Sequence, residues 1–432
     1  MERLIHYVWK FRLYSSDQLR TVDGIPFSVI DPGIHNTNAG PDFFNAKICI
    51  DNKVWAGNVE IHTHASDWNR HGHCSDDAYN SVILHLVENA DIAAVFAKNG
   101  RSIHQSVIKI PDEIRNNYEY LLHSDKEVPC LDRIFEIPEI YLTAWKNSLF
   151  IERIEQKTNH IFNILQQSNG DWEEALYILL CRNFGFGING DAFERLAKSL
   201  PFRCIQKHQD NPLQIESLFL GQAGLLEEDD ISDTYYFSLQ QEYSFLQRKF
   251  NLTPLESYLF KRLRIRPNNF PHVKLAQLAM LFSQGEHFFS KILFADGMDD
   301  YFQLFSPQIS DYWQEHYHFK SQSAKKEKRL GLSALHIIII NTVVPLLFAY
   351  GKSKKLNQFI EKSIFLMEKI PPEKNAITLL FARAGVDVCH AADSQALIQL
   401  RREYCEKKKC LFCRIGHQLL SNPGKIDKFA DK

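Results

Sequence analysis

The sequence predicts an α/β domain followed by a mostly α-helical region. Short apolar runs between Gly and Asn turns fill the first 111 residues, as in β-strands. From there to about residue 380, apolar residues recur at three- and four-residue spacing, as on helix faces. The chain from residue 381 onward is basic and holds four of the nine cysteines. We therefore expect three parts, spanning residues 1–111, 112–380 and 381–432.

The first part begins with a predicted helix and continues with predicted strands. The opening "MERLIHYVWKFRLY" carries charges among its apolar residues, which favours a docked helix over a secretory signal. Strands are predicted at "PFSVID", "DFFNAKICI", "KVWAGNVEIHTH", "SVILHLV" and "IAAVFA". Turn residues separate them, for example Asp51 and Asn52.

The second part contains helices with recognisable starts. Asp171 with Glu174, and Asp191 with Glu194, have the spacing of capping boxes. Further helices are predicted at "DTYYFSLQQEYSFLQRKF", "HVKLAQLAMLF" and "KLNQFIEKSIFLMEKI", and "SQSAKKEKRLGLS" is predicted to be a solvated loop. The apolar "ALHIIIINTVVPLLFAY" is shorter than a membrane span and contains Pro345. We expect it to be a buried core helix that breaks near this proline, with no membrane partner.

The totals constrain the class of protein. The 432 residues are 45% hydrophobic and 24% charged, which is typical of a folded globular protein. A formal charge of -2 excludes a global positive field, so a nucleic-acid partner would need a local basic patch. The odd number of cysteines, nine, favours reduced thiols and a cytoplasmic location.

The most informative segment places carboxylates and histidines on predicted strands. If 53–64 is a strand, Glu60, His62 and His64 share one face, while Val59 and Ile61 point the other way. Asp42 begins the preceding strand. Carboxylate oxygens suit Mg²⁺ or Mn²⁺, so Asp42 and Glu60 meeting from neighbouring strands would form a metal site.

These residues also carry a resemblance. "PD" at Pro41 and Asp42, with "VEIH" ending at His62, resembles the PD-(D/E)XK nuclease motif, which implies a restriction-endonuclease-like fold. The resemblance implies that Asp42 and Glu60 are metal ligands and that His62 replaces the lysine that positions the attacking water. Lys47 is a candidate substitute, but on a regular strand it would face away from Asp42.

The segments "NAGPDFFNAKI", "WAGNVEIHTHASDW", "YNSVILHLV", "RPNNFPHVKLAQLA" and "YCEKKKCLFCRIG" resemble an uncharacterised bacterial family known as a domain of unknown function. That resemblance covers nearly the whole chain and implies no activity. The main hypothesis is therefore a divalent-metal-dependent nuclease with catalytic Asp42, Glu60 and His62. The alternative is a catalytically inactive nucleic-acid-binding or scaffold protein, consistent with the missing lysine.

A further alternative uses the other histidines of the segment. Imidazole nitrogen favours Zn²⁺ over Mg²⁺, so a zinc-dependent hydrolase would gather a second set of side chains. That set is His62, His64, His71 and His73 with Asp77, and His64, Asp67, His71, His73 and Asp77 are together candidates for an additional site. His85, in the apolar "VILHLV", is expected to be a core histidine, and Trp68 a core anchor.

Two other motifs lie outside this segment. Cys405, Cys410, Cys413 and His417 have a spacing that suits a structural zinc site, with Cys389 or His390 as other fourth ligands. An iron–sulfur cluster on Cys389 and the other three cysteines is the alternative. "FKRLRIRPNNFPHVK" is a candidate phosphate-binding patch, and a solvated helix end is its simpler interpretation. Its basic residues include Arg262, Arg264, Arg266 and Lys274.

Overall fold

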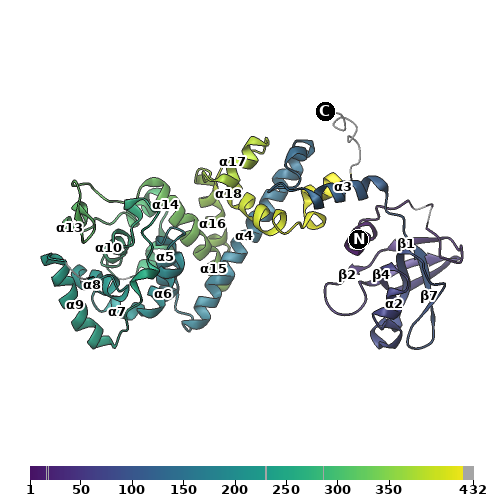
Figure 1. The fold of residues 1–432 in the computed structure, drawn as a ribbon, viewed down its shortest axis with the longest axis horizontal. Helices are drawn as coiled ribbons and strands as arrows, with labels where there is room; N and C mark the ends of the chain where they lie inside the picture. The colour runs from purple at the N-terminus through teal and green to yellow at the C-terminus, as the bar shows by residue number, and fades with distance from the viewer. Residues whose placement is uncertain (16, 18, 229–230, 286, 422–432) are drawn as a thin grey trace. The chain divides into compact units, whose positions relative to one another are not determined.

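The computed structural model describes residues 1–15, 17, 19–228, 231–285 and 287–421, which form two compact units (Figure 1). Unit 1 comprises Met1–Trp145, Leu379–Asp387 and Leu400–Lys432, and unit 2 comprises Lys146–Thr378 and Val388–Gln399. This division differs from the predicted boundaries at 111 and 381, because most of the cysteine-bearing tail belongs with the N-terminal unit. Residues 422–432, the end of the predicted tail, lie outside the described residues.

Unit 1 is built on a mixed sheet with strand order β1-β3-β4-β5-β7-β6, and β2 also pairs with β3. The pairs β1/β3, β3/β4 and β6/β7 are antiparallel, whereas β4/β5 and β5/β7 are parallel. The strands are β1 Phe27–Asp31, β2 Ile34–His35, β3 Phe43–Ile50, β4 Lys53–His64, β5 Val82–Asn89, β6 Val95–Phe96 and β7 Ser102–Val107. The predicted strand at 53–64 is confirmed, whereas the predicted strand at 92–97 is only two residues long.

Helix α1 covers one part of this sheet. It spans Glu2–Lys10, as predicted for the N-terminal segment, and contacts β4. Its residues Leu4, Ile5 and Val8 are fully buried, because their three- and four-residue spacing places them on one face of the helix. Trp9 is also buried, and its indole N–H donates to the carbonyl of Pro32 at 3.0 Å. The helix thereby brings His6 towards the start of β3.

Short helices complete unit 1. After β4 come α2 Asp67–Arg70, η2 His73–Ser75 and η3 Asp77–Ser81, and after β7 come α3 Asp112–His123 and η4 Leu131–Glu136. The C-terminal segment adds η8 Leu400–Cys405, η9 Cys410–Phe412 and α19 Arg414–Ser421. Helix α19 packs against α3, where the Asn117 side-chain amide donates to the carbonyl of Leu419 at 3.1 Å. The C-terminal cysteines are therefore held within the N-terminal unit.

Unit 2 is mostly helical, as the apolar spacing predicts. Its helices, two of which cross into unit 1 residues, are α4 Glu139–Gln167, α5 Trp172–Phe184, α6 Gly190–Ser199, α7 Phe202–Gln206, α8 Pro212–Gln222, α9 Thr234–Phe250, η5 Ser257–Leu259, η6 Pro267–Asn269, α10 Pro271–Phe282, α11 Phe288–Phe294, α12 Met298–Leu304, α13 Asp311–Glu315, α14 Leu332–Ile338, η7 Ile339–Val343, α15 Val344–Lys354, α16 Asn357–Lys369, α17 Ala376–Arg383 and α18 Ala391–Gln399. Strands β8 His316–His318 and β9 Ser321–Gln322 form a small hairpin.

The two predicted capping boxes have different outcomes. Asp171 caps α5 as expected, since its carboxylate accepts from the backbone N–H groups of Glu173 and Glu174 at 2.9 and 3.1 Å. The prediction at Asp191 is wrong, because α6 already begins at Gly190 and places Asp191 inside its first turn. Glu194 is instead paired with Arg182 and Lys198.

The longest apolar helical stretch runs from Leu332 to Lys354 and could cross a membrane by length and composition, but 67% of its apolar window is buried within the protein. It contains a π-helical turn, η7, just before Pro345. Proline has no N–H to donate four residues back, so the carbonyl of Asn341 is free of that bond. The side-chain amide of Asn183 donates to this carbonyl at 2.9 Å. The proline therefore produces a π-turn in a continuing helical stretch, and the predicted break does not occur.

The prediction of a solvated loop at 321–333 is wrong at Lys328 and Leu330, which are both buried. Lys328 is only 1% exposed. Its ammonium donates to the carbonyls of Trp313, Gln314 and His316 at 2.7, 3.1 and 2.8 Å. Burying a cation is tolerated when such partners replace water. The segment is therefore anchored into unit 2 through its own lysine.

Candidate functional site

The site forms where β3, β4 and β5 lie side by side. β4 alternates as predicted: Val59 and Ile61 are fully buried on one face, and Glu60 and His62 point to the opposite face. The parallel register pairs Glu60 with His85 of β5, which places this histidine on the same face as Glu60. Neighbouring strands thereby present ionisable groups to one another, and Glu60 and His62 are only 5% and 1% exposed.

Asp42 and Glu60 meet across the β3–β4 pair. The Asp42 carboxylate accepts from the backbone N–H of Ile61 at 2.9 Å, and Glu60 Oε2 accepts from the backbone N–H of Asp42 at 3.1 Å. His6 of α1 lies beside them, with its Nε2 3.3 Å from Asp42 Oδ2. The two carboxylates are therefore held in fixed orientations by backbone donors, and Glu60 Oε1 is directed elsewhere.

Glu60 Oε1 faces the histidines. It lies 3.2 Å from His73 Nε2 and 3.5 Å from His62 Nε2. His62 Nε2 is in turn 3.1 Å from Nδ1 of His71. Each of the histidines His62, His71 and His73 offers one nitrogen within 4.8 Å of the other two. Ligands about 2.0 Å from a tetrahedral metal ion lie roughly 3.3 Å apart, and the 3.1 Å between His62 Nε2 and His71 Nδ1 is close to such a separation.

The chain after β4 supplies two of these histidines through a tight turn. Gly72 stands between His71 and His73 with φ +74°, a conformation that favours glycine. His73 then packs face to face on Tyr79, with ring centroids 3.8 Å apart. Trp68 is fully buried, and its indole N–H donates to the carbonyl of Phe96 at 3.1 Å. Trp68 is thus the core anchor that the sequence favours.

Burial sets the charge state of the cluster. It raises the pKa of the Glu60 carboxyl, an effect that the nearby His73 imidazole opposes. Burial, together with the neighbouring imidazoles of His85, His73 and His71, lowers the pKa of His62 to about 3. His85 behaves alike, with a pKa lowered by burial to about 3. The neutral imidazoles of His62 and His85 have lone pairs, the form in which histidine binds metals.

His62 has both ring nitrogens engaged. Its Nδ1 lies 2.9 Å from Nε2 of His85, and its Nε2 faces His71 and Glu60. The Nδ1 contact fixes the ring in the manner of the outer-shell partners that orient metal-binding histidines. His85 is therefore buried, as the sequence predicts, and in addition positions a member of the cluster.

The other residues of the predicted histidine set do not join the cluster. His64 is exposed at the end of β4, and Asp67 pairs with Arg70 at 2.7 Å. Asp77 lies on the surface, where it pairs with Lys98 at 2.5 Å. β4 ends at His64. Of the histidines and carboxylates considered for a zinc site, the structure brings together His62, His71 and His73.

The parity argument against Lys47 is also wrong. The register of β3 against β4 shifts between Phe43 and Ala46, and Asn45 has a positive φ of 58°. This bulge inserts a residue, so Lys47 is on the same face as Asp42. However, Lys47 pairs with Ala56, four residues before Glu60, and is exposed. It stays apart from the cluster because of distance along the strand.

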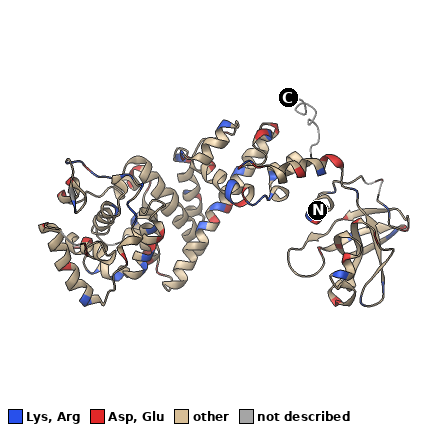
Figure 2. Ribbon diagram, in the orientation of Figure 1, with Lys and Arg blue, Asp and Glu red and all other residues tan. Residues whose placement is uncertain are grey.

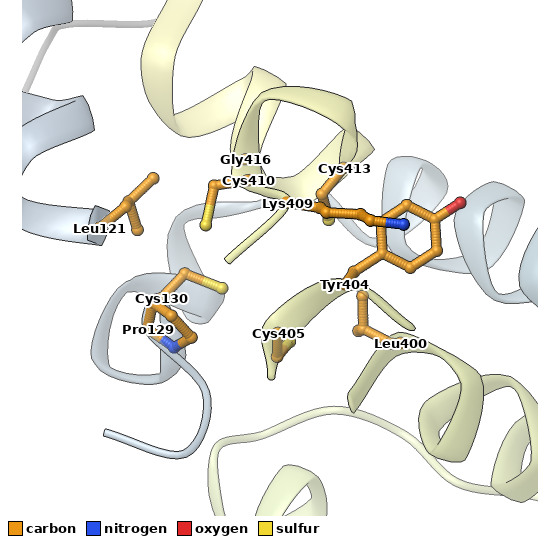
Figure 3. A pocket seen from close by; sticks show the side chains of 10 residues that line it. All are labelled: Leu121, Pro129, Cys130, Leu400, Tyr404, Cys405, Lys409, Cys410, Cys413 and Gly416. Carbon is orange, nitrogen blue, oxygen red and sulfur yellow. The ribbon is translucent and has the colours of Figure 1, made fainter. Parts of the chain in front are cut away.

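The structure places a different fourth residue beside the three C-terminal cysteines than the sequence predicts. Cys405, Cys410 and Cys413 are buried and line a pocket in unit 1, together with Cys130 from the segment before η4 (Figure 3). His417 is directed elsewhere, with its Nδ1 2.9 Å from the Tyr7 hydroxyl. Cys389 and His390 belong to unit 2, where Cys389 is exposed. Cys130 carries no local motif, so sequence spacing gives no sign of it.

The predicted phosphate-binding patch is only partly exposed. Arg262, Arg264 and Arg266 are exposed in unit 2, and Arg262 pairs with Glu228 at 3.6 Å. Lys274 is 3% exposed in α10, where its ammonium donates to Gln277 at 3.0 Å and lies over the Phe186 ring. Burial lowers its pKa to about 7. Lys274 is therefore unavailable to a phosphate, and Figure 2 shows basic and acidic residues interspersed along both units.

Comparison with known proteins identifies a family. The model of a protein family of unknown function, DUF2851, matches residues 2–376. The chain therefore belongs to that family, as the resemblance of its whole-chain segments implies. The matched span includes the histidine cluster and Cys130 and ends before the three C-terminal cysteines. No curated protein and no solved structure matches the chain, so the resemblance to the PD-(D/E)XK nucleases has no support from these comparisons.

Proposed function

We propose that this member of a family without an assigned activity is a metal-dependent hydrolase that cleaves phosphodiester bonds in nucleic acid. The observation that carries the proposal is the group of three histidines His62, His71 and His73, each of which offers one nitrogen within 4.8 Å of the other two. Glu60 Oε1 adjoins this group, 3.2 Å from His73 Nε2 and 3.5 Å from His62 Nε2.

The donor set favours Zn²⁺. Three imidazoles select a borderline-soft transition metal, whereas Mg²⁺ prefers oxygen ligands and bound water. This differs from the Mg²⁺ or Mn²⁺ expected from Asp42 and Glu60 alone. A bound Zn²⁺ would lower the pKa of a water ligand and stabilise charge on a phosphoryl oxygen.

The surrounding residues have separate roles in the proposal. His62, His71 and His73 would hold the metal and leave its fourth position to a water. Glu60 is the buried carboxylate beside these ligands, and His85 orients His62. Asp42 is the partly exposed carboxylate beside them, held by the backbone of Ile61 and by His6. It is the group placed to accept the proton from the attacking water. His62 was expected to position this water, but its buried, doubly engaged ring fits a ligand role better.

The substrate class rests on the sequence motif. "PD" and "VEIH" bring Asp42 and Glu60 to neighbouring positions of adjacent strands, which is the arrangement that the nuclease resemblance implies for hydrolysis of a phosphodiester. The overall charge supplies no general attraction for a polyanion. Binding would therefore depend on contacts close to the site and on the metal itself.

The test is cleavage of labelled single- and double-stranded DNA and RNA with Zn²⁺, Mn²⁺ or Mg²⁺. We expect Zn²⁺ to support cleavage and Glu60→Gln to reduce its rate by roughly 100-fold, because the carboxylate beside His62 and His73 is lost. Asp42→Asn should slow cleavage by roughly 100-fold while the zinc stays bound, because only the proton acceptor is removed. His64→Ala and Asp77→Asn are matched controls outside the cluster and should retain nearly full activity.

Other outcomes separate the alternatives. Zinc retention that depends on His73, with no nucleic-acid cleavage, would reject the substrate class and keep the hydrolytic metal site. Nucleic-acid binding without zinc retention or cleavage would favour the inactive binding protein. Activity that Mg²⁺ supports and that survives His71→Ala would return the metal to Asp42 and Glu60 alone.

A further inference from the structure

Four buried cysteines meet in unit 1, away from the histidine cluster. Cys130 precedes η4, Cys405 ends η8, Cys410 begins η9, and Cys413 follows η9. All four line one pocket, and Figure 3 shows their sulfur atoms arranged around a common space. They are free thiols, as are all nine cysteines. Two distant parts of the chain thus contribute soft ligands to one place.

The rest of the pocket offers little competing chemistry. Its other walls are mostly apolar and come from Leu121, Pro129, Leu400, the ring of Tyr404 and Gly416, with Lys409 at its side. Hard cations such as Mg²⁺ and Ca²⁺ require several oxygen ligands, and the side chains that line this pocket do not provide them. Four thiolates in an apolar setting suit zinc or an iron–sulfur cluster.

The sulfur spacing separates these two. Four thiolates on one zinc ion, each about 2.3 Å from the metal, lie roughly 3.8 Å apart. Among the side chains that the structure describes, the histidine triad is the group of metal-capable residues whose ligand atoms all lie within 4.8 Å. No three of the four sulfurs meet that distance. An iron–sulfur cluster places inorganic sulfide and several iron atoms between its thiolates and accepts a wider arrangement.

The backbone around the sulfurs is fixed and directs donors at them. The N–H groups of Ile415 and Gly416, in the first turn of α19, donate to the Cys413 sulfur. A Cβ at Gly416 would come within 2.1 Å of the Cys410 carbonyl oxygen, so the helix approaches the cysteine loop as closely as only glycine allows. Backbone donors to cysteine sulfur are one means by which proteins tune iron–sulfur clusters.

Ion pairs and hydrogen bonds also hold the two segments together. Arg401 pairs with Glu127 at 3.1 Å, and the Lys408 ammonium donates to the carbonyl of Ser124. The segment around Cys130 is thereby fixed to the segment that carries the other three cysteines. Contacts between these two distant segments therefore form the pocket and bring its four thiols together.

We infer that Cys130, Cys405, Cys410 and Cys413 ligate an iron–sulfur cluster that joins the C-terminal segment to the segment after α3. The cluster is structural and separate from the hydrolytic site. Because its ligands come from distant parts of the chain, it closes a long loop and stabilises unit 1 against unfolding.

The test begins with the full-length protein purified without oxygen. Iron and acid-labile sulfide are measured per chain, together with zinc and the visible absorption spectrum. We expect iron and sulfide in equal amounts, a broad visible absorption, and bleaching with a lower unfolding midpoint when the cluster is oxidised. Zinc in place of iron, or iron without sulfide, would overturn the assignment without any variant being made.

Variants identify the ligands. Cys130→Ser should lower the iron content at least tenfold, whereas Cys389→Ser, at an exposed cysteine of unit 2, should leave it unchanged. Cys181→Ser controls for loss of a buried thiol elsewhere. Equal iron content in Cys130→Ser and wild type, or a loss that follows Cys389, would contradict the ligand set. The wild-type sulfide measurement stands even if Cys130→Ser folds poorly.

Discussion

The histidine cluster of unit 1 and the buried charges of unit 2 use ionisable residues in opposite ways. In unit 2, the Glu216 carboxylate accepts from the Tyr235 hydroxyl and the Trp313 indole at 2.9 and 2.5 Å. Lys328 is satisfied by three carbonyls. Each charge has its own donors or acceptors, and none points at another ligand atom. These groups hold helices and loops together.

In unit 1, several buried ring nitrogens lack an aligned partner. Within the described part of the chain, this holds for His73 Nε2 and His85 Nδ1, even though Glu60 Oε1 lies 3.2 Å from His73 Nε2. An unsatisfied buried polar atom costs free energy, so its retention needs a reason. For His73 a bound metal ion is a candidate reason, because its ring belongs to the group with His62 and His71, whereas His85 lies outside that group.

The comparison shows that convergence identifies a candidate site better than burial does. His272 of unit 2 illustrates the point, since both its ring nitrogens are buried without a partner among the described residues. It lies among the rings of Trp313 and Phe319, away from any group of metal-capable side chains that the structure describes. A lone unsatisfied histidine indicates no site, whereas the three histidines His62, His71 and His73 together offer a candidate one.

The largest effect is expected for His73→Phe. The variant keeps the ring that stacks on Tyr79 but removes a metal ligand, so zinc affinity should fall by roughly 100-fold or more. The unfolding midpoint of the metal-free protein should stay the same or rise, because an unpartnered buried nitrogen is lost. Calorimetric zinc titration and thermal unfolding measure the two effects, with His64→Phe as the exposed control. Unchanged zinc affinity would show that the cluster is structural, like the charges of unit 2.

Lys328→Met should have the opposite profile. Removing the ammonium leaves carbonyls without their donor, so unit 2 should be destabilised by about 3–5 kcal/mol. Zinc affinity and hydrolysis should not change. Chemical denaturation gives the loss of stability, and Lys326→Met, at an exposed position of the same segment, is the control. A change in zinc affinity as large as that in His73→Phe would remove the contrast between the units.

Glu216 predicts a pH dependence for unit 2. Burial raises its pKa from 4.5 to about 7, against the hydrogen bonds from Trp313 and Tyr235. Folded unit 2 binds a proton that the unfolded chain releases, so this stabilisation is full below about pH 4.5 and is lost as the pH rises through about 7. Glu216→Gln should remove this decline and should raise stability at about pH 8 by roughly 2–3 kcal/mol.

Thermal unfolding from about pH 5 to pH 8 measures this effect. Glu361→Gln, at an exposed position of α16, is the control and should keep the wild-type profile. A Glu216→Gln profile parallel to that of the wild type would mean that another group causes the decline. The hydrogen bonds to Glu216 would then be sufficient to keep it ionised.

Much of the fold follows from local pattern. The alternation in 53–64 predicts a strand with the bounds of β4, and it places Glu60 and His62 on the face opposite Val59. The three- and four-residue apolar spacing likewise predicts α9, α10 and α16. Backbone geometry fixes these periods residue by residue, so a single sequence contains them.

Local pattern fails where position depends on contacts between distant residues. It does not distinguish His71 and His73, which the turn at Gly72 directs into the cluster, from His64, which remains in solvent. Nor does it show that Lys274 and Lys328 are buried, because their charge alone predicts exposure. A bulge of one residue in β3 is enough to change the face of Lys47.

The sequence by itself determined an α/β part before a helical part, and the segment in which a site would lie. Only the tertiary structure decided which side chains meet there. It joined Glu60 to His62, His71 and His73, and it placed Cys130 beside the C-terminal cysteines in place of His417. The reason is physical: strand and helix periods come from neighbouring residues, whereas a site comes from packing that brings distant residues to within a few ångströms.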